Sequence, residues 1–184
     1  MARGDHLPGV RPRPSLGRAL DFAARRIFPA VLTLAAMALS ELPLGLPEQA
    51  ALLPAVASAS VWYWTLHRPA AMPPAAVFAI GLWLDLRGYL PLGVGVLTLL
   101  GIHGAALRWQ RYLADRGLAL PWIAFLPLAA GSSAAVWGLT SLLTFRWLSP
   151  APALFQAALT AALYPLAAAA LSALRRAVPD PDDS

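Results

Sequence analysis

The sequence predicts an all-α integral membrane protein with about six transmembrane helices and with both termini in the cytoplasm. Of its 184 residues, 59% are hydrophobic and only 12% are charged, a composition typical of membrane proteins. The apolar residues gather in six runs that are separated by short turns. About 20 apolar residues are enough for a helix to cross a bilayer. The distribution of arginine then indicates the orientation of the six expected spans.

Arginine supplies all 14 basic residues of the chain, whose net charge is +5. If six spans start from a cytoplasmic N-terminus, Arg87 and Arg146 lie outside and the other arginines lie inside, which is the positive-inside pattern. Because the basic residues adjoin apolar runs, we expect no nucleic-acid partner. The inner arginines are Arg3, Arg11, Arg13, Arg18, Arg25, Arg26, Arg68, Arg108, Arg111, Arg116, Arg175 and Arg176.

The chain divides into three regions by composition. Residues 1–24 are rich in Arg and Pro and predict a disordered cytoplasmic tail, which either orients the protein or touches anionic lipid. Residues 25–176 are expected to form one six-helix transmembrane domain, and 177–184 an acidic disordered tail. Arg25-Arg26 before an apolar run also permits a twin-arginine export signal, but the whole downstream chain is membrane-like and no soluble cargo follows.

The first three apolar runs predict helices over about 25–44, 49–66 and 72–86. The second and third are short for a span, so a re-entrant pair is the alternative to two full crossings. The second run ends in Trp62-Tyr63-Trp64, a pattern typical of an aromatic belt at the membrane interface. Tyr63 and Trp64, together with Arg68 in the following loop, are therefore expected to anchor the helix or to contact a partner or lipid.

The last three runs predict helices over about 90–109, 119–145 and 153–174. On the fifth, the Gly131/Ala135 and Ala134/Gly138 spacings favour close helix packing. On the sixth, Gln156, Thr160 and Tyr164 form a polar stripe, which either bonds to neighbouring helices or lines a small-molecule cavity. His103, inside the fourth, has no second titratable group on its helix for a proton relay, so a hydrogen bond to another helix is expected.

The third and fourth runs meet in a polar hairpin around Asp85. A carboxylate within a membrane helix costs roughly 2.5–3.5 kcal/mol at the bilayer centre, so Asp85 needs a partner, water or a place near the interface. Gly81 lies one turn earlier on the same face and permits a neighbouring helix to approach. Arg87, Gly88 and Tyr89 are expected to reverse the chain, and Pro91 suits the first turn of the next helix.

The segment Gly81-Leu-Trp-Leu-Asp85-Leu-Arg-Gly88-Tyr-Leu-Pro91-Leu-Gly93 resembles the motif of the bacterial rod shape-determining protein MreD family. That motif consists of Gly-Leu, two hydrophobic residues and Asp, then a short polar turn and Pro-Leu-Gly. Tyr63-Trp64 and Arg68-Pro69 resemble the end of the family's second helix, and the length and helix number are also similar.

This resemblance implies a non-catalytic inner-membrane scaffold or regulator of the machinery that elongates rod-shaped cells and builds sidewall peptidoglycan. The implied partners are a bitopic MreC-like protein and, directly or indirectly, MreB filaments, RodA and a penicillin-binding transpeptidase. Asp85 and the hairpin residues Gly81, Arg87, Gly88, Pro91 and Gly93 are then either a partner contact or a structural element. Arg108 and Arg111 are expected to meet MreB or anionic lipid on the cytoplasmic side.

No enzyme motif is present: the chain has no HExxH, GxSxG or P-loop sequence. It has no cysteine, and its three histidines are too scattered for a metal site. We therefore expect no catalysis, no cofactor and no metal.

The alternative function is the substrate-binding membrane subunit of an energy-coupling-factor vitamin transporter, because the MreD fold resembles those six-helix subunits. Such a binder needs a polar, aromatic-lined cavity and long outer loops, whereas the outer loops expected here are short. A small transporter or channel is the third alternative, but no continuous charged path supports it.

Overall fold

The computed structural model describes residues 16–43, 45, 48–87 and 91–177. In these residues the chain forms six α-helices, as the sequence predicts, and two short 3-10 helices, with no strand. The 3-10 helices are η1 (Gln49–Ala51) and η2 (Pro69–Ala71). The α-helices are α1 (Leu16–Ser40), α2 (Leu52–His67), α3 (Pro74–Arg87), α4 (Val94–Leu113), α5 (Ala119–Leu143) and α6 (Ala151–Ala177).

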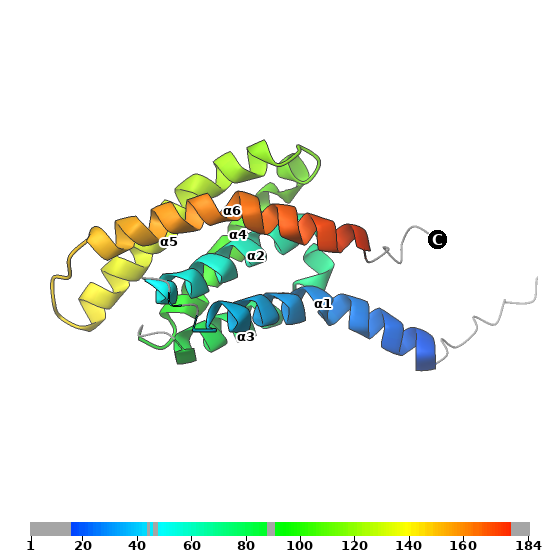
Figure 1. The fold of residues 1–184 in the computed structure, drawn as a ribbon, viewed down its shortest axis with the longest axis horizontal. Helices are drawn as coiled ribbons and strands as arrows, with labels where there is room; N and C mark the ends of the chain where they lie inside the picture. Colours follow the sequence, from blue (N-terminus) through cyan, green and yellow to red (C-terminus); the bar gives the residue numbers. More distant parts are fainter. Residues whose placement is uncertain (1–15, 44, 46–47, 88–90, 178–184) are drawn as a thin grey trace, which may run out of the picture.

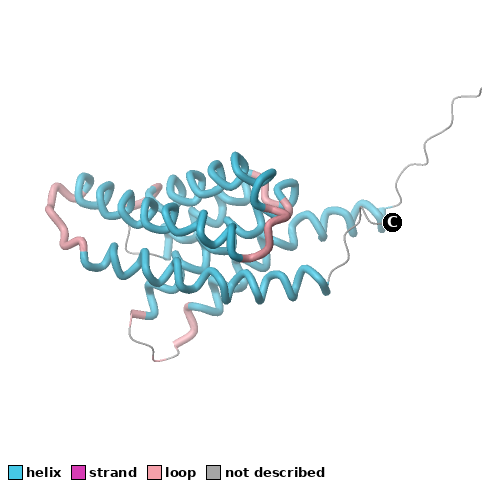
Figure 2. The backbone as a smooth tube through the Cα atoms, turned by 90° about the horizontal axis from the view of Figure 1, so that it is seen from above, coloured by secondary structure: helices cyan, strands magenta, loops and turns pink. Residues whose placement is uncertain are grey.

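The helices form an elongated bundle with two distinct ends (Figures 1 and 2). One end, here called the terminal end, holds the start of α1, the α2–α3 and α4–α5 connections and the end of α6. The opposite end, called the hairpin end, holds the α1–α2, α3–α4 and α5–α6 connections. Arg87 is the last residue of α3, and Arg146 follows α5, so the two arginines expected outside share the hairpin end.

Helix α2 is the centre of the bundle and packs against α1, α3, α4 and α6. Every residue from Ala57 to Leu66 is buried, and the side chains of Trp62 and Trp64 have no exposed surface. The large apolar residues of α2 lie on all of its faces, with small Ala and Ser residues between them. A helix of this composition is suited to burial on all sides. The Trp62 indole donates to the Pro121 carbonyl at 3.2 Å, which satisfies its only polar group.

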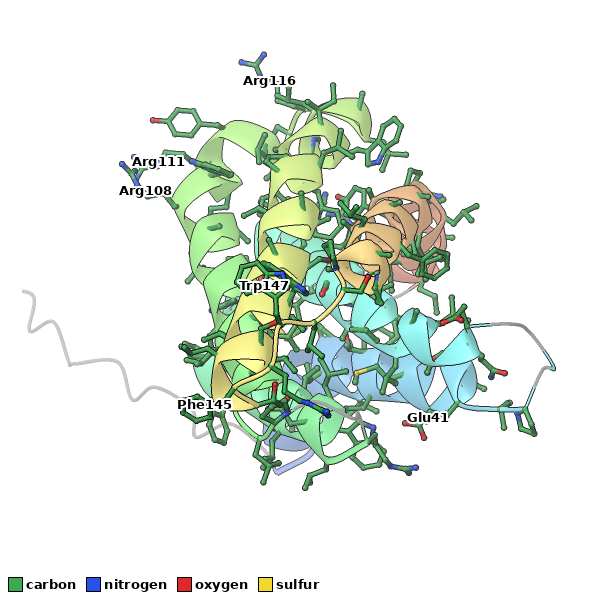
Figure 3. The ribbon with its side chains drawn as sticks, turned by 90° about the vertical axis from the view of Figure 1, so that its left-hand side faces the viewer. Glu41, Arg108, Arg111, Arg116, Phe145 and Trp147 are labelled. Carbon is green, nitrogen blue, oxygen red and sulfur yellow. The ribbon has the colours of Figure 1, made fainter. Side chains whose placement is uncertain are left out.

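The buried aromatic residues of α2 differ from the interfacial belt that the sequence indicated. Tyr63 is 3% exposed and Trp64 is fully buried, so neither side chain reaches the outer surface of the bundle. Exposed aromatic rings occur instead near both ends. Phe145 and Trp147 project from the α5–α6 connection (Figure 3), and Trp109, Tyr112 and Trp122 lie exposed on either side of the α4–α5 connection.

Helices α5 and α6 are long and apolar enough to cross a membrane, over Ala119–Leu143 and Ala151–Arg176. Few of their residues are buried, and large exposed side chains include Leu126, Leu154 and Leu166. In the rest of the described chain, Ile27–Ser40 is apolar but shorter. Length and composition therefore support a membrane location most directly for the two C-terminal helices.

Two helix starts differ from the predicted bounds. Helix α1 begins at Leu16, inside the segment expected to be a disordered tail, because Pro14 is followed by helix-forming Leu, Ala and Arg residues. Helix α4 begins at Val94 rather than near residue 90, because Gly93 adopts a left-handed φ of 98° that a helix interior does not allow. The remaining tail predictions, for residues 1–15 and 178–184, fall outside the described residues.

A capped helical hairpin beside a polar cavity

The carboxylate of Asp85 caps the N-terminus of α4. Its side chain leaves the last turn of α3, is 3% exposed, and accepts hydrogen bonds from three backbone N–H groups. The donor–acceptor distances are 2.8 Å from Gly93, 2.7 Å from Gly95 and 3.3 Å from Val96. The first N–H groups of a helix have no partner within the helix, and they carry the positive end of its dipole. Asp85 thus supplies both the acceptors and the negative charge that this helix start requires.

Two glycines allow α3 and α4 to come this close. A Cβ atom built on Gly81 would lie 2.7 Å from the Val96 Cα atom, which is backbone and cannot move aside. A Cβ atom on Gly95 would overlap the Asp85 carboxylate itself. The close approach of another helix at Gly81, expected from the sequence, is therefore present, and Val96 of α4 is the residue that approaches.

The turn before α4 depends on Pro91 and Gly93. The Val94 N–H donates to the Pro91 carbonyl at 3.2 Å, so Pro91 belongs to a turn that precedes the helix and not to its first turn. Gly93 is the N-cap residue and holds the left-handed conformation that favours glycine. Gly88, the remaining glycine of the motif, lies outside the described residues.

These contacts give Asp85 a structural role. Both carboxylate oxygens accept hydrogen bonds from backbone N–H groups of α4, and no arginine of the described chain forms an ion pair with Asp85. Arg87 instead pairs with Glu41 after α1, at 2.9 Å, and its guanidinium lies 5.0 Å from the centre of the Trp83 ring. Arg146 lies exposed in the α5–α6 connection.

Breaking the Glu41–Arg87 ion pair is expected to change stability only slightly. The side chain of Arg87 is 52% exposed and that of Glu41 is 24% exposed. Ion pairs that are this accessible to solvent contribute up to about 1 kcal/mol to the free energy of unfolding. The variants Glu41→Gln, Arg87→Gln and the double variant, compared by denaturant titration of the purified protein, give the coupling energy directly. A coupling well above 1 kcal/mol would show that the pair is shielded from water in the folded protein.

A cavity of about 880 Å³ opens beside the hairpin at the same end of the bundle. It lies where α1 and α3 end, α2 and α4 begin, and α5 meets α6. Aliphatic side chains and Trp137 form much of its wall, and the hydroxyl groups of eight Ser and Thr residues lie among them. Because six helices each contribute a few residues, no single stretch of sequence indicates this cavity.

The polar stripe on α6 both bonds to another element and lines the cavity. The Gln156 side-chain amide donates to the Ala51 carbonyl at 3.1 Å and to the Thr160 hydroxyl at 3.0 Å, and both stripe residues face the cavity. Tyr164 lies deeper, fully buried, with its ring 4.9 Å from that of Phe125. Gln156 and Thr160 therefore combine the two roles that the sequence left open, whereas Tyr164 belongs to the core.

His103 is a buried hydrogen-bonding residue between α4 and α2. Its Nδ1 atom lies 2.9 Å from the Thr65 hydroxyl, the contact with another helix that the sequence predicts. The side chain is 4% exposed, and its Nε2 atom has no hydrogen-bond partner among the described residues. This arrangement fixes the orientation of the ring and brings no second titratable group to it.

The expected cytoplasmic contact residues lie far from the hairpin. Arg108 and Arg111 are exposed on α4 and project away from the bundle near its terminal end (Figure 3). Arg68 follows α2 at the same end and is partly exposed. Tyr63 stacks on His67, with ring centres 4.3 Å apart, so it closes the core at that end and presents little surface to a partner.

The described residues contain no group of three or more His, Asp or Glu side chains that could hold a metal ion. What the site offers is a rigid α3–α4 hairpin, a neutral hydroxyl-lined cavity and outward apolar helix faces. No family model, curated protein or solved structure matches the chain.

Proposed function

We propose that the chain is a non-catalytic inner-membrane scaffold or regulator of the bacterial rod-elongation complex, as its resemblance to the MreD family implies. The observation that carries the proposal is the α3–α4 hairpin. Gly81, Asp85, Pro91 and Gly93, which carry the resemblance, cooperate in one compact structure through backbone contacts. A motif that builds a helix–helix joint, with no reactive group left free, is what a scaffold requires.

In this proposal all six helices cross the inner membrane, and both termini lie in the cytoplasm. The apolar outer faces of α5 and α6 support a membrane location. Exposed aromatic rings near both ends of the bundle match the two interfaces of a bilayer. The excess of arginine at the terminal end supports placing that end inside.

The proposed mechanism is association between membrane helices. The connections between helices are short, so the chain has little aqueous mass with which to meet a partner. Its outward helix faces would bind the single membrane helix of an MreC-like protein, and through that complex RodA and the penicillin-binding transpeptidase. The exposed Arg108 and Arg111 would contact MreB filaments or anionic lipid.

Affinity purification of the tagged chain from native membranes in mild detergent tests the proposal. We expect an MreC-like bitopic protein and elongation enzymes to co-elute with it. The variant with both Arg108→Glu and Arg111→Glu is expected to retain the MreC-like protein and to lose most of the MreB, because the reversed charges repel an acidic surface. Mass spectrometry of the eluate measures both.

The matched control for this charge reversal is Arg116→Glu, an exposed arginine in the α4–α5 connection. It makes the same kind of change at the same end of the bundle without altering α4. Equal MreB recovery in all three proteins would remove the role of Arg108 and Arg111. An eluate without any MreC-like protein would contradict the scaffold function itself.

The cavity favours a second candidate, the substrate-binding subunit of an energy-coupling-factor vitamin transporter. A volume of about 880 Å³ with scattered hydroxyls and one tryptophan can accommodate a vitamin-sized molecule. The short α5–α6 connection at the hairpin end disfavours it, because it is too short to fold over a bound solute. Recovery of a transmembrane coupling protein with ATPases in the same purification would establish this candidate and exclude the scaffold.

A further inference from the structure

Two nearly buried serines in the wall of the cavity lack hydrogen-bond partners. Ser58 of α2 and Ser133 of α5 are each 6% exposed, and both line the cavity. Neither hydroxyl bonds to another residue in the part of the chain that the structure describes. Their hydroxyl oxygens are not sealed inside the protein but are open to the cavity, where they can bond to water or to a ligand.

The charges around the cavity favour an uncharged ligand. Among the residues that line it, only Glu41 and Arg87 are charged, and they neutralise each other at 2.9 Å. The second carboxylate oxygen of Glu41 is buried without a partner among the described residues and can accept a hydrogen bond. A phosphate or carboxylate group would find no unpaired cation here, whereas a hydroxyl-bearing group would find both donors and acceptors.

An apolar groove of about 350 Å³ lies beside the cavity, between α4 and α5. The two hollows share Thr98 and Ser132, and the rest of the groove is aliphatic or glycine. A Cβ atom on Gly101 or Gly131 would have no neighbour within 4 Å, and both glycines are exposed. The close packing expected at Gly131 and Ala135 is therefore absent, and an open apolar groove adjoins the polar cavity.

We propose that this chain binds a single-chain membrane amphiphile with an uncharged, hydroxyl-bearing head group. The head group occupies the cavity and bonds to Ser58, Ser133 and the free oxygen of Glu41. The hydrocarbon chain lies in the groove over Gly101 and Gly131 and extends to the lipid. The polar cavity and the adjoining apolar groove match the polar head and the apolar chain of such a molecule, and a water-soluble ligand would leave the groove empty.

The test uses the full chain in phosphatidylcholine nanodiscs that contain a small fraction of 1-oleoylglycerol, which has an uncharged diol head and one chain. Native mass spectrometry measures the lipid retained when the protein is released. We expect one retained molecule of 1-oleoylglycerol per chain, in preference to phosphatidylglycerol in a parallel preparation. Gly131→Leu fills the groove and should reduce retention about tenfold, which corresponds to about 1.4 kcal/mol.

Ala130→Leu is the matched control, because Ala130 is an exposed neighbour on the same helix and does not line the groove. It should retain the lipid as the unmodified chain does. Gly131→Leu meets open space and is expected to fold, so its loss of lipid reports on binding. Ser133→Leu, which fills the cavity, provides the second variant and should give the same loss.

Three outcomes would overturn the proposal. The first is absence of retained 1-oleoylglycerol in the unmodified chain. The second is equal retention in Gly131→Leu and Ala130→Leu, which would mean that the lipid is only adventitious and surrounds the protein nonspecifically. The third is binding of free glycerol as strong as that of 1-oleoylglycerol, which would mark the cavity as a solute site. None of these depends on whether the chain associates with MreC.

Discussion

Replacing Asp85 with Ala is expected to lower the free energy of unfolding by about 3 kcal/mol, because it leaves three N–H groups at the start of α4 without an acceptor. Two of these hydrogen bonds are 2.8 Å or shorter, and the carboxylate is buried. Bonds of this kind to a charged acceptor are stronger than neutral ones. The change also removes a negative charge from the positive end of the α4 dipole. For a chain of this length we expect the unfolding midpoint to fall by roughly 6–12 °C.

The intrinsic fluorescence of the buried Trp62 and Trp64 follows unfolding in a denaturant titration of the detergent-solubilised protein. Asp85→Asn keeps one acceptor oxygen without the charge and should fall between Asp85→Ala and the unmodified chain. Asp115→Ala, at an exposed carboxylate in the α4–α5 connection, is the control for charge removal alone. If Asp85→Ala and Asp115→Ala were equally stable, the cap would contribute nothing.

The same variant separates folding from partner binding. Reduced recovery of an MreC-like protein with Asp85→Ala would be ambiguous by itself, because a damaged hairpin weakens any surface built on α3 and α4. Comparing recovery at equal amounts of folded protein removes this ambiguity. Normal recovery per folded molecule is the expected result, since Asp85 presents no free oxygen to a partner.

Two substitutions of glycine by alanine are expected to have opposite effects on stability. Gly81→Ala places a methyl group 2.7 Å from the Val96 Cα atom and forces α3 and α4 apart, and overpacking of this kind costs about 1–3 kcal/mol. Separation of the helices also lengthens the hydrogen bonds of Asp85, so the upper part of that range is expected. Gly104→Ala, on the exposed face of α4, meets no atom within 4 Å and should gain about 0.5–1 kcal/mol of helix propensity.

Thermal unfolding of the two variants side by side measures this difference. Because both changes add one methyl group to a helix, any general effect of the substitution cancels. Destabilisation of both proteins to the same extent would show that α3 and α4 are not in contact at Gly81. Stabilisation of Gly81→Ala would show the same.

The positions of the six helices could be predicted from the sequence, whereas several of their ends could not. Apolar run lengths place α2 to α6 to within a few residues of their observed bounds. The start of α4 depends on the left-handed Gly93 and the distant Asp85 cap, which are visible only in three dimensions. The burial of Trp62 to Trp64 was missed for a related reason: a lipid-facing ring and a core ring require the same apolar surroundings, so composition does not separate them.

The site was predictable in part. The contact at Gly81 could be predicted because a glycine within a helix allows another helix to approach closely. Val96 of α4 is that neighbour in the structure. The partners of Asp85 were missed because they are backbone N–H groups, which every residue has and no sequence pattern displays. The cavity was indicated only by Gln156 and Thr160, since its other walls come from five further segments.

The burial of α2 also has a consequence for how the protein is assembled during synthesis. Helix α2 is made before α4 and α6, which cover much of its surface. Until α6 is made, the side of α2 that α6 will cover has no neighbour from this helix. Because other helices surround α2, it can carry the polar residues Ser58 and Ser60. Its burial then depends on helices that are made later. Helix α6 thus completes the protein surroundings of α2.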